Sequence, residues 1–113
     1  MLGKALLLLL VFELCVADSR PGFVVQTPGQ RPWGRTTYDE SLNAAFGAGN
    51  WAELTFSSPI TTILDPERSI LWIEGSDRLA IAANNFMATY KTAIETWVDG
   101  GGRIFVNSAP NQG

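Results

Sequence analysis

Two patterns of apolar and polar positions occur along this chain, and each predicts a different kind of element. Unbroken apolar runs at 23–25, 70–73 and 104–106 are typical of strands in a parallel sheet that is covered on both faces. Residues 51–56 instead place their side chains alternately on two sides, as a half-buried strand does. We therefore expect strands in these four places, and we expect the last run, at 104–106, to be buried.

Apolar side chains three or four residues apart between positions 79 and 98 predict a long amphipathic helix. The asparagines at 84–85 are a weak point in this pattern, so two helices joined by a kink there are an alternative. Ser76 is a suitable N-cap, because its hydroxyl can accept an unpaired N–H of the first helical turn. The glycines at 100–102 predict a sharp helix end.

A shorter helix is expected over 40–46, capped by Thr37 or Asp39, whereas 59–67 is expected to be a loop. The resulting order is strand, helix, strand, loop, strand, helix, strand. Such an order is typical of an α/β fold with a parallel sheet. We expect one domain of this class over residues 18–113, incomplete at its C-terminal end because no helix follows the last strand.

The first residues differ from the rest, and we expect a secretory signal peptide over 1–17. Lys4 precedes an unbroken apolar run at 5–12, and Cys15 and Ala17 are the small residues that a cleavage site requires. The run is too short to span a bilayer. Removal of this segment would leave a secreted or cell-surface domain without a membrane span. An uncleaved N-terminal anchor or a buried first helix is the alternative.

The amino-acid composition limits the classes of function that this chain can have. The chain is 46% hydrophobic and 17% charged, which suits a globular core. Its net charge of −3, with acidic and basic residues scattered, argues against nucleic acid and anionic membranes as partners. Cys15 is the only cysteine and there is no histidine, so the domain lacks a thiol nucleophile, the commonest general base and the usual zinc ligands. We therefore expect no metal and no cofactor. A secreted domain without disulfides is also more usual in bacterial exports.

Candidate binding residues lie just after the apolar runs at 70–73 and 104–106. In open α/β sheets, ligands bind beyond the carboxyl ends of the strands. The expected ligand-binding residues are Glu74, Ser76, Asp77, Asn107, Ser108 and Asn111. Paired carboxylates such as Glu74 and Asp77 suit acid–base chemistry or a hard cation. The simpler alternative places Asp77 in the first helical turn and lets Glu74 accept loop N–H groups.

Two other side chains have two interpretations each. Ser108 carries a hydroxyl that could act as a nucleophile, but no base lies near it in sequence, which favours an ordinary turn residue. Trp33 lies in a loop rich in glycine and proline and is the tryptophan best placed to be exposed, since Trp72 and Trp97 fall at core positions. It could stack on a sugar or cover the core as a lid.

The segments 70–76 and 94–106 resemble a class I glutamine-amidotransferase-like domain of the trehalose-utilisation type, which implies a flavodoxin-like, three-layer fold. Residues 107–111 also resemble domains of large secreted bacterial surface proteins. Catalytic members of the family carry a cysteine inside a Gly-x-Cys-x-Gly turn after the last strand. Here that position falls near Ser108 or Ala109, without the cysteine or its glycines, so the resemblance implies a non-catalytic member.

We therefore expect an exported, non-catalytic α/β module that forms a binding or structural part of a larger bacterial surface or secreted protein. A surface glycan or a protein would be its partner. The alternative is the N-terminal part of a secreted amidotransferase-like hydrolase of amides or glycans, with catalytic residues beyond Gly113.

Overall fold

The structure is a computed structural model, and it describes residues 17–109. Its elements in chain order are β1 (Gly22–Val25), the 3-10 turn η1 (Pro32–Gly34), α2 (Thr37–Phe46), β2 (Ala52–Thr55), α3 (Ile60–Ile63), β3 (Ile70–Glu74), α4 (Ala80–Thr89), α5 (Lys91–Asp99) and β4 (Arg103–Asn107). Asn111 and nearly all of the expected signal peptide lie outside the described residues. Within the described part, none of the helices has the length and apolar character needed to cross a membrane.

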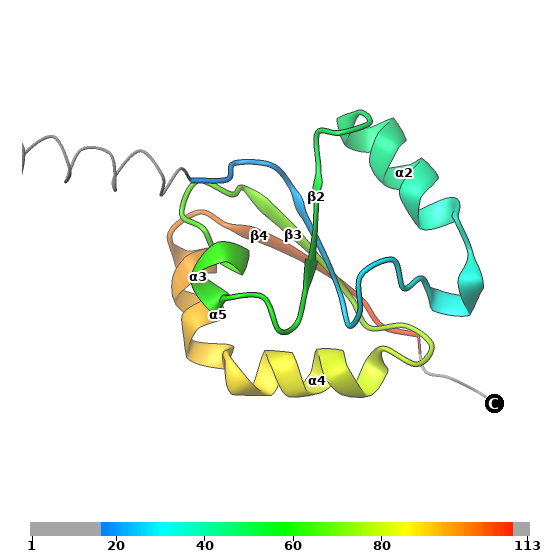
Figure 1. Cartoon of the computed structure of the whole chain (residues 1–113). Helices are drawn as coiled ribbons and strands as arrows, with labels where there is room; N and C mark the ends of the chain where they lie inside the picture. Colours follow the sequence, from blue (N-terminus) through cyan, green and yellow to red (C-terminus); the bar gives the residue numbers. More distant parts are fainter. Residues whose placement is uncertain (1–16, 110–113) are drawn as a thin grey trace, which may run out of the picture.

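The strands form one parallel sheet in the order β2-β1-β3-β4. From β1 the chain runs outward to β2, and it then crosses back over β1 to continue with β3 and β4 on the other side (Figure 1). The predicted α/β class with a parallel sheet is therefore confirmed, and the order agrees with flavodoxin-like folds as far as β4. Because the direction of winding reverses between β1 and β3, these two central strands form the topological switch point.

Helices cover both faces of the sheet, which gives the three predicted layers (Figure 1). The face under α2 has a buried cluster made of Phe23, Val25, Leu42 and Leu79. The face under α3, α4 and α5 has a second cluster made of Val24, Ile63, Leu71, Ile73, Ala83, Phe86, Ile94 and Trp97. Successive side chains of a strand point to opposite faces, so the unbroken apolar runs of β1 and β3 supply both clusters.

The three glycines after α5 have distinct structural reasons. Gly101 has a φ of 109°, a conformation that side chains with a Cβ rarely adopt. A Cβ on Gly102 would lie 2.4 Å from the Trp97 ring, so only glycine lets the chain pass beneath this indole into β4. The predicted helix end at the glycines is confirmed, and packing against Trp97 fixes the direction in which the chain leaves it.

The expectation that residues 104–106 are buried is wrong. They form β4 as predicted, but within residues 17–109 β4 lies at the edge of the sheet and has β3 on one side only. Phe105 and Val106 are 52% and 43% exposed, while Ile104 packs partly against the cluster under α4 and α5. An apolar run identifies a strand, but it does not say which neighbours the strand has.

The long helical segment also differs from expectation. Helix α4 begins only at Ala80, so Ser76 is not its N-cap. Asp77 is not in the first turn either, because its backbone has a φ of 56°. The break falls at Tyr90, between α4 and α5. It does not fall at 84–85, where both asparagine side chains are exposed and the helix continues unbroken.

Two further boundaries are corrected. Helix α2 begins at Thr37, and the N-cap residue Thr36 makes no side-chain cap hydrogen bond, so neither Thr37 nor Asp39 is the cap. The segment 59–67 is not wholly a loop, because it contains the single turn α3. Ile63 of α3 is fully buried, and the need to bury it explains why this segment folds onto the sheet.

Candidate functional site

The carboxyl ends of β1 and β3 lie side by side at the switch point. The segment after β1 leads to α2 on one face of the sheet, and the segment after β3 leads to α4 on the other (Figure 1). In open α/β sheets, ligands bind beyond the carboxyl ends of the strands, at the point where two connections leave toward opposite faces. Asn107 extends this edge on the neighbouring strand, since it is in register with Glu74.

Glu74 is fully buried, and neutral donors hold its carboxylate. Oε1 accepts the Ser76 backbone N–H at 3.1 Å, and Oε2 accepts the Trp72 Nε1–H at 3.0 Å. Asn107 Nδ2 donates to both oxygens at 3.2 Å. A buried carboxylate is costly unless such hydrogen bonds replace water. The expected proximity of Glu74 and Asn107 is thus observed, and so is the bond from a loop N–H. Through these bonds Glu74 links β3, the loop after β3 and β4 at this edge of the sheet.

Asp77 and Trp33 form the most unusual feature of this edge. The Trp33 backbone N–H donates to Asp77 Oδ2 at 2.9 Å, which joins the segment after β1 to the segment after β3. Both residues have left-handed backbones, with φ of 53° at Trp33 and 56° at Asp77, and no other described residue except glycine does. Such conformations cost free energy and are concentrated at functional sites. This hydrogen bond therefore joins the two loops at the switch point, with backbone strain on both sides.

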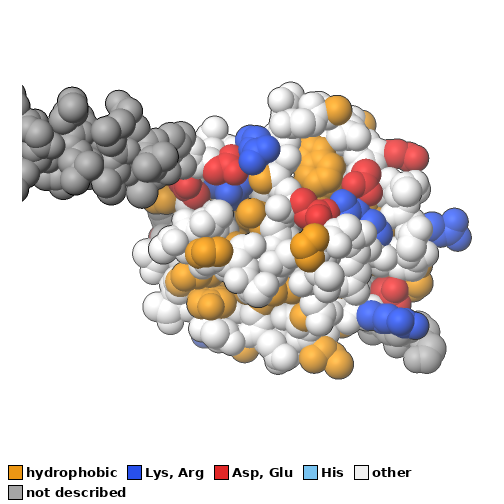
Figure 2. Space-filling model, viewed as in Figure 1, with side chains coloured by type: hydrophobic (Ala, Val, Ile, Leu, Met, Phe, Trp, Pro, Cys, Tyr) orange, Lys and Arg blue, Asp and Glu red, His pale blue; other side chains and the backbone are white. Residues whose placement is uncertain are grey.

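Trp33 stands on a loop that is firmly held. Arg31 donates to both carboxylate oxygens of Asp39 at 2.8 and 2.9 Å, pairs with Glu53 of β2, and lies 5.1 Å from the centre of the Phe23 ring. The Arg31 guanidinium lowers the pKa of Asp39. Glu53 also accepts the Gly29 N–H at 2.9 Å. Figure 2 shows acidic and basic side chains gathered between β2 and α2, where this network lies.

Tyr38, in the first turn of α2, lies close enough to the carboxylates of the site for their charges to affect its pKa. Burial raises the pKa of Tyr38, and the negative charges of Glu74 and Asp77 raise it further. Its ring packs against Trp72 and Phe23, with centroids 6.3 and 6.5 Å away. Tyr38 therefore forms the wall of the site on the α2 face.

The remaining predicted residues have different positions. Ser76 is fully buried, and its Oγ accepts the Ala109 N–H at 3.3 Å, while the Ala109 carbonyl accepts the Asp77 N–H at 3.0 Å. The chain after β4 is thus tied to the loop after β3. Ser108 is exposed, and Asn111 lies outside the described residues. Of the predicted set, the structure brings together Glu74, Ser76, Asp77 and Asn107.

Sequence reasoning did not include Trp33, Arg31 and Tyr38 among the site residues. Trp33 was identified as the tryptophan best placed to be exposed, and it is 52% exposed. No local signal connects it to Asp77, which lies 44 residues further along the chain. Arg31 and Tyr38 join the site through tertiary contacts alone.

The side chains at this edge offer hydrogen-bonding groups and an aromatic face. Ser108 has no histidine to activate it, because the chain contains none. Among residues 17–109, no group of three or more His, Cys, Asp or Glu side chains is placed to hold a metal ion. What the edge does present is an exposed tryptophan whose backbone N–H is bonded to a half-buried carboxylate, Asp77.

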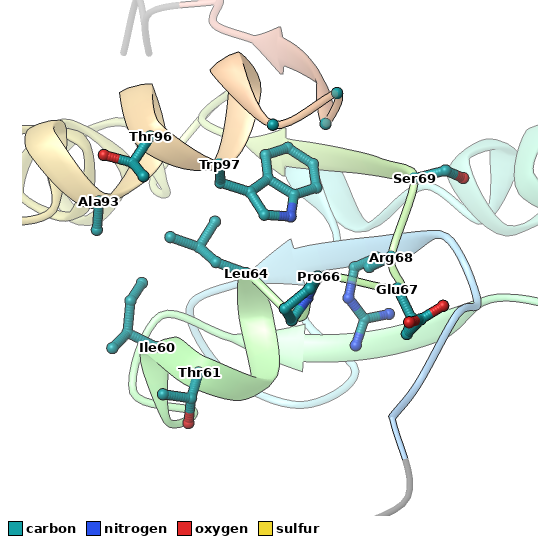
Figure 3. Close-up of a pocket in the computed structure, with 13 residues that line it drawn as sticks. Ile60, Thr61, Leu64, Pro66, Glu67, Arg68, Ser69, Ala93, Thr96 and Trp97 are labelled. Carbon is teal, nitrogen blue, oxygen red and sulfur yellow. The ribbon is translucent and has the colours of Figure 1, made fainter.

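A pocket of about 630 Å³ lies at the opposite end of the strands, between α3 and α5. Figure 3 shows Ile60 and Leu64 facing Ala93, Thr96 and Trp97 across it. Hydrophobic side chains also gather on the surface over α3 and α5 in Figure 2. The pocket is predominantly apolar, and its size falls within the range of small-molecule sites.

Arg68 is the cation of this pocket, but its donors are already used. It is 1% exposed and donates to the carbonyls of Ile63 at 3.2 Å, Thr62 at 3.0 Å and Arg20. Asp18 Oδ2 lies 3.5 Å from its Nη2. Because these contacts occupy the guanidinium, Arg68 clamps the start of the domain to α3 and is a poor ligand for a guest. We therefore place the functional site at the switch point.

Comparison with protein-family models, with curated proteins and with solved structures found no match. Fold and site together define an α/β protein with a parallel 2-1-3-4 sheet and two strained residues, Trp33 and Asp77, joined at its switch point.

Proposed function

We propose that this chain is an exported, non-catalytic binding module of a larger bacterial surface or secreted protein, and that it binds a glycan at the surface around Trp33 and Asp77 at the switch point. The observation that carries the proposal is the bond between Trp33 and Asp77, two strained residues from different loops. The structure keeps this strain because the surrounding contacts fix both loops.

An exposed and immobile indole suits a sugar ring. Trp33 is 52% exposed, yet its loop is fixed by Asp77, by the Arg31 network and by the fully buried Pro32. The C–H faces of a sugar ring offer apolar area of about the size of an indole, and a rigid aromatic residue loses little conformational entropy on binding. Trp33 would therefore provide the stacking platform.

Polar groups beside the indole suit sugar hydroxyls. Asp77 uses Oδ2 for the Trp33 N–H, which leaves Oδ1 to accept from a ligand. Arg35 and Arg78 are exposed and follow Trp33 and Asp77 closely in sequence, so they would supply donors at the rim. A sugar matches this combination of one aromatic face, one acceptor and a few donors.

A contact near the N-terminus supports export with cleavage after Ala17. The backbone nitrogen of Asp18 lies 2.9 Å from Asp65 Oδ2. After cleavage this nitrogen would be the terminal ammonium group, and the same contact would become a charge-assisted hydrogen bond, which is the stronger kind. The folded domain thus has an acceptor ready for the N-terminus that cleavage would create.

The test is binding of the purified protein to an array of neutral and acidic bacterial glycans, followed by calorimetric titration of any glycan that binds. Trp33→Ala removes the indole and keeps the backbone N–H, so affinity should fall at least about tenfold, or 1.4 kcal/mol. Asp77→Asn keeps an oxygen for the Trp33 N–H and tolerates the left-handed backbone, so it should weaken binding by removing the charge and by replacing the free acceptor Oδ1 with an NH₂ donor. Ile81→Ala is the matched control, because Ile81 is 77% exposed on α4.

Loss of binding in Trp33→Ala with normal binding in Ile81→Ala supports the proposal. Failure to bind any neutral or acidic glycan contradicts glycan recognition. Equal affinities for the wild type and Trp33→Ala contradict the site.

A further inference from the structure

The outer edge of β4 is open to another strand. β4 pairs with β3 on one side, and no strand within residues 17–109 pairs with its other side. Phe105 and Val106 are two of the five large hydrophobic side chains that are markedly exposed in the described part of the chain, and they are adjacent. The centre of β4 has none of the prolines, lysines or bulges by which proteins block exposed edges.

The backbone bonds of β4 show which of its groups face outward. The Arg103 N–H donates to the Ser69 carbonyl at 3.0 Å, and the Asn107 carbonyl accepts the Gly75 N–H at 2.7 Å, so both residues direct their backbone groups toward β3. In a parallel strand, alternate residues direct both N–H and C=O to the same side. Ile104 and Val106 therefore present their N–H and C=O groups outward.

We propose that a second copy of this chain pairs with that edge, β4 against β4 and antiparallel, about a twofold axis at Phe105. In this register Ile104 lies opposite Val106 of the second copy, and Arg103 lies opposite Asn107. The apolar centre of each strand meets the apolar centre of the other, with a polar residue at each end. A twofold contact requires such self-complementarity.

The outward backbone groups fit the same register. Antiparallel strands alternate between pairs that exchange two hydrogen bonds and pairs that exchange none. Ile104 and Val106, which carry the outward groups, become hydrogen-bonded pairs across the axis. Phe105, whose groups point toward β3, becomes the pair without hydrogen bonds, in which side chains approach most closely. A centre at Ile104 would instead place Phe105 opposite Arg103.

A row of aromatic rings leads to this axis. Phe23, Trp72 and Phe105 are in register on β1, β3 and β4, with ring centroids 5.4 and 5.2 Å apart and nearly perpendicular planes. The row ends at Phe105, which is half exposed. The second copy continues the row through its own Phe105, and cross-strand aromatic pairs stabilise sheets. The result is one continuous sheet of two copies.

Such a contact is small, so the association should be weak. One strand pair buries less surface than a standard protein interface, and we expect dissociation constants roughly in the micromolar range. Sedimentation velocity over a hundredfold range of protein concentration measures this. The wild-type protein should shift from monomer to dimer. Val106→Pro, which removes an outward N–H and leaves the bonds to β3, should stay monomeric. Val106→Ala, which keeps that N–H, is the matched control and should still dimerise.

A second variant gives a positive signal, a covalent crosslink, when the dimer forms. Phe105→Cys, made together with Cys15→Ser, places two thiols across the axis at the separation that a disulfide needs. Diamide, as the oxidant, should convert this protein to a covalent dimer, whereas Ile81→Cys with Cys15→Ser should crosslink far more slowly. A monomer at all concentrations without crosslinking at residue 105 overturns the proposal. Open-ended oligomers also overturn it, because a twofold contact closes.

Discussion

Replacing Glu74 by glutamine tests the hydrogen-bond frame of the site, because the side chain keeps its shape and loses one acceptor. In the wild type, both carboxylate oxygens accept: Oε1 from Ser76 N–H, Oε2 from Trp72 Nε1–H, and each from Asn107 Nδ2. Glutamine has one oxygen and one NH₂ group. Asn107 can turn its amide to accept from the new NH₂, but the indole of Trp72 only donates.

The expected cost follows from these contacts. With the glutamine oxygen facing Ser76, the NH₂ group faces the Trp72 N–H, so one donor loses its acceptor and meets another donor. Leaving a polar group unsatisfied costs about 1–3 kcal/mol, and the charge assistance to the Ser76 bond is also lost. Burying a neutral amide in place of a charge offsets part of this. We expect Glu74→Gln to lower the free energy of unfolding by about 2 kcal/mol, and the melting temperature by roughly 10 °C.

A double-mutant cycle with Trp72→Phe isolates the energy of the clash between the glutamine NH₂ group and the Trp72 indole N–H. Phenylalanine has no N–H, so Glu74→Gln should cost about 1 kcal/mol less in the Trp72→Phe background than in the wild type. Urea unfolding of the four proteins, followed by circular dichroism, gives the coupling energy. If the two substitutions are additive, or if Glu74→Gln is as stable as the wild type, the Trp72 bond does not hold the carboxylate and the reasoning is refuted.

Three further predictions follow from other contacts. Gly102→Ala should lower the unfolding free energy by about 3 kcal/mol because its Cβ overlaps the Trp97 ring. Gly100→Ala, whose Cβ would meet the Trp97 and Thr96 carbonyls at 3.4 and 3.6 Å, ordinary contact distances, and whose φ is −78°, should be nearly neutral in the same urea titration. Hydrogen bonding to Arg20 lowers the pKa of Asp18 to about 2, so the stability it contributes is complete above about pH 4 and is lost as the pH falls toward 2. The Arg20 side chain is half exposed, so the loss of unfolding free energy should be about 1 kcal/mol or less. The loss should be absent in Asp18→Asn. Equal acid titrations of the wild type and Asp18→Asn would contradict this ion pair. Mass spectrometry of secreted protein should find Asp18 as the first residue, and intact Met1 would contradict cleavage.

Local pattern predicted the fold because each signal was itself local. The apolar runs of β1 and β3 and the glycines after α5 depend on neighbouring residues and on burial, so the parallel sheet and its strands could be predicted. The burial of β4 could not, since exposure of Phe105 depends on the absence of a neighbour across the edge. The prediction that Ser76 is an N-cap was wrong, because its hydroxyl accepts the Ala109 N–H from the chain after β4.

The candidate site, like the fold, could be predicted only in part. That Glu74 and Asn107 meet follows from parallel strands sharing an edge, and they do so at 3.2 Å. The pairing of Asp77 with Trp33 depends on both loops adopting left-handed backbones, and a tryptophan gives no sequence signal for such a backbone. Strain of this kind is visible only in the structure.

The indole N–H signals of the tryptophans test the location of the site most directly. Three of the four tryptophans donate their Nε1–H within the fold: Trp51 to Asn43, Trp72 to Glu74 and Trp97 to Asp65. Trp33 is exposed at the switch point, and Trp97 lines the apolar pocket at the opposite end. In ¹⁵N-labelled protein titrated with a glycan that binds, the Trp33 signal should shift most and the Trp97 signal should stay in place. A shift at Trp97 with Trp33 unchanged would place binding in the pocket and contradict the account.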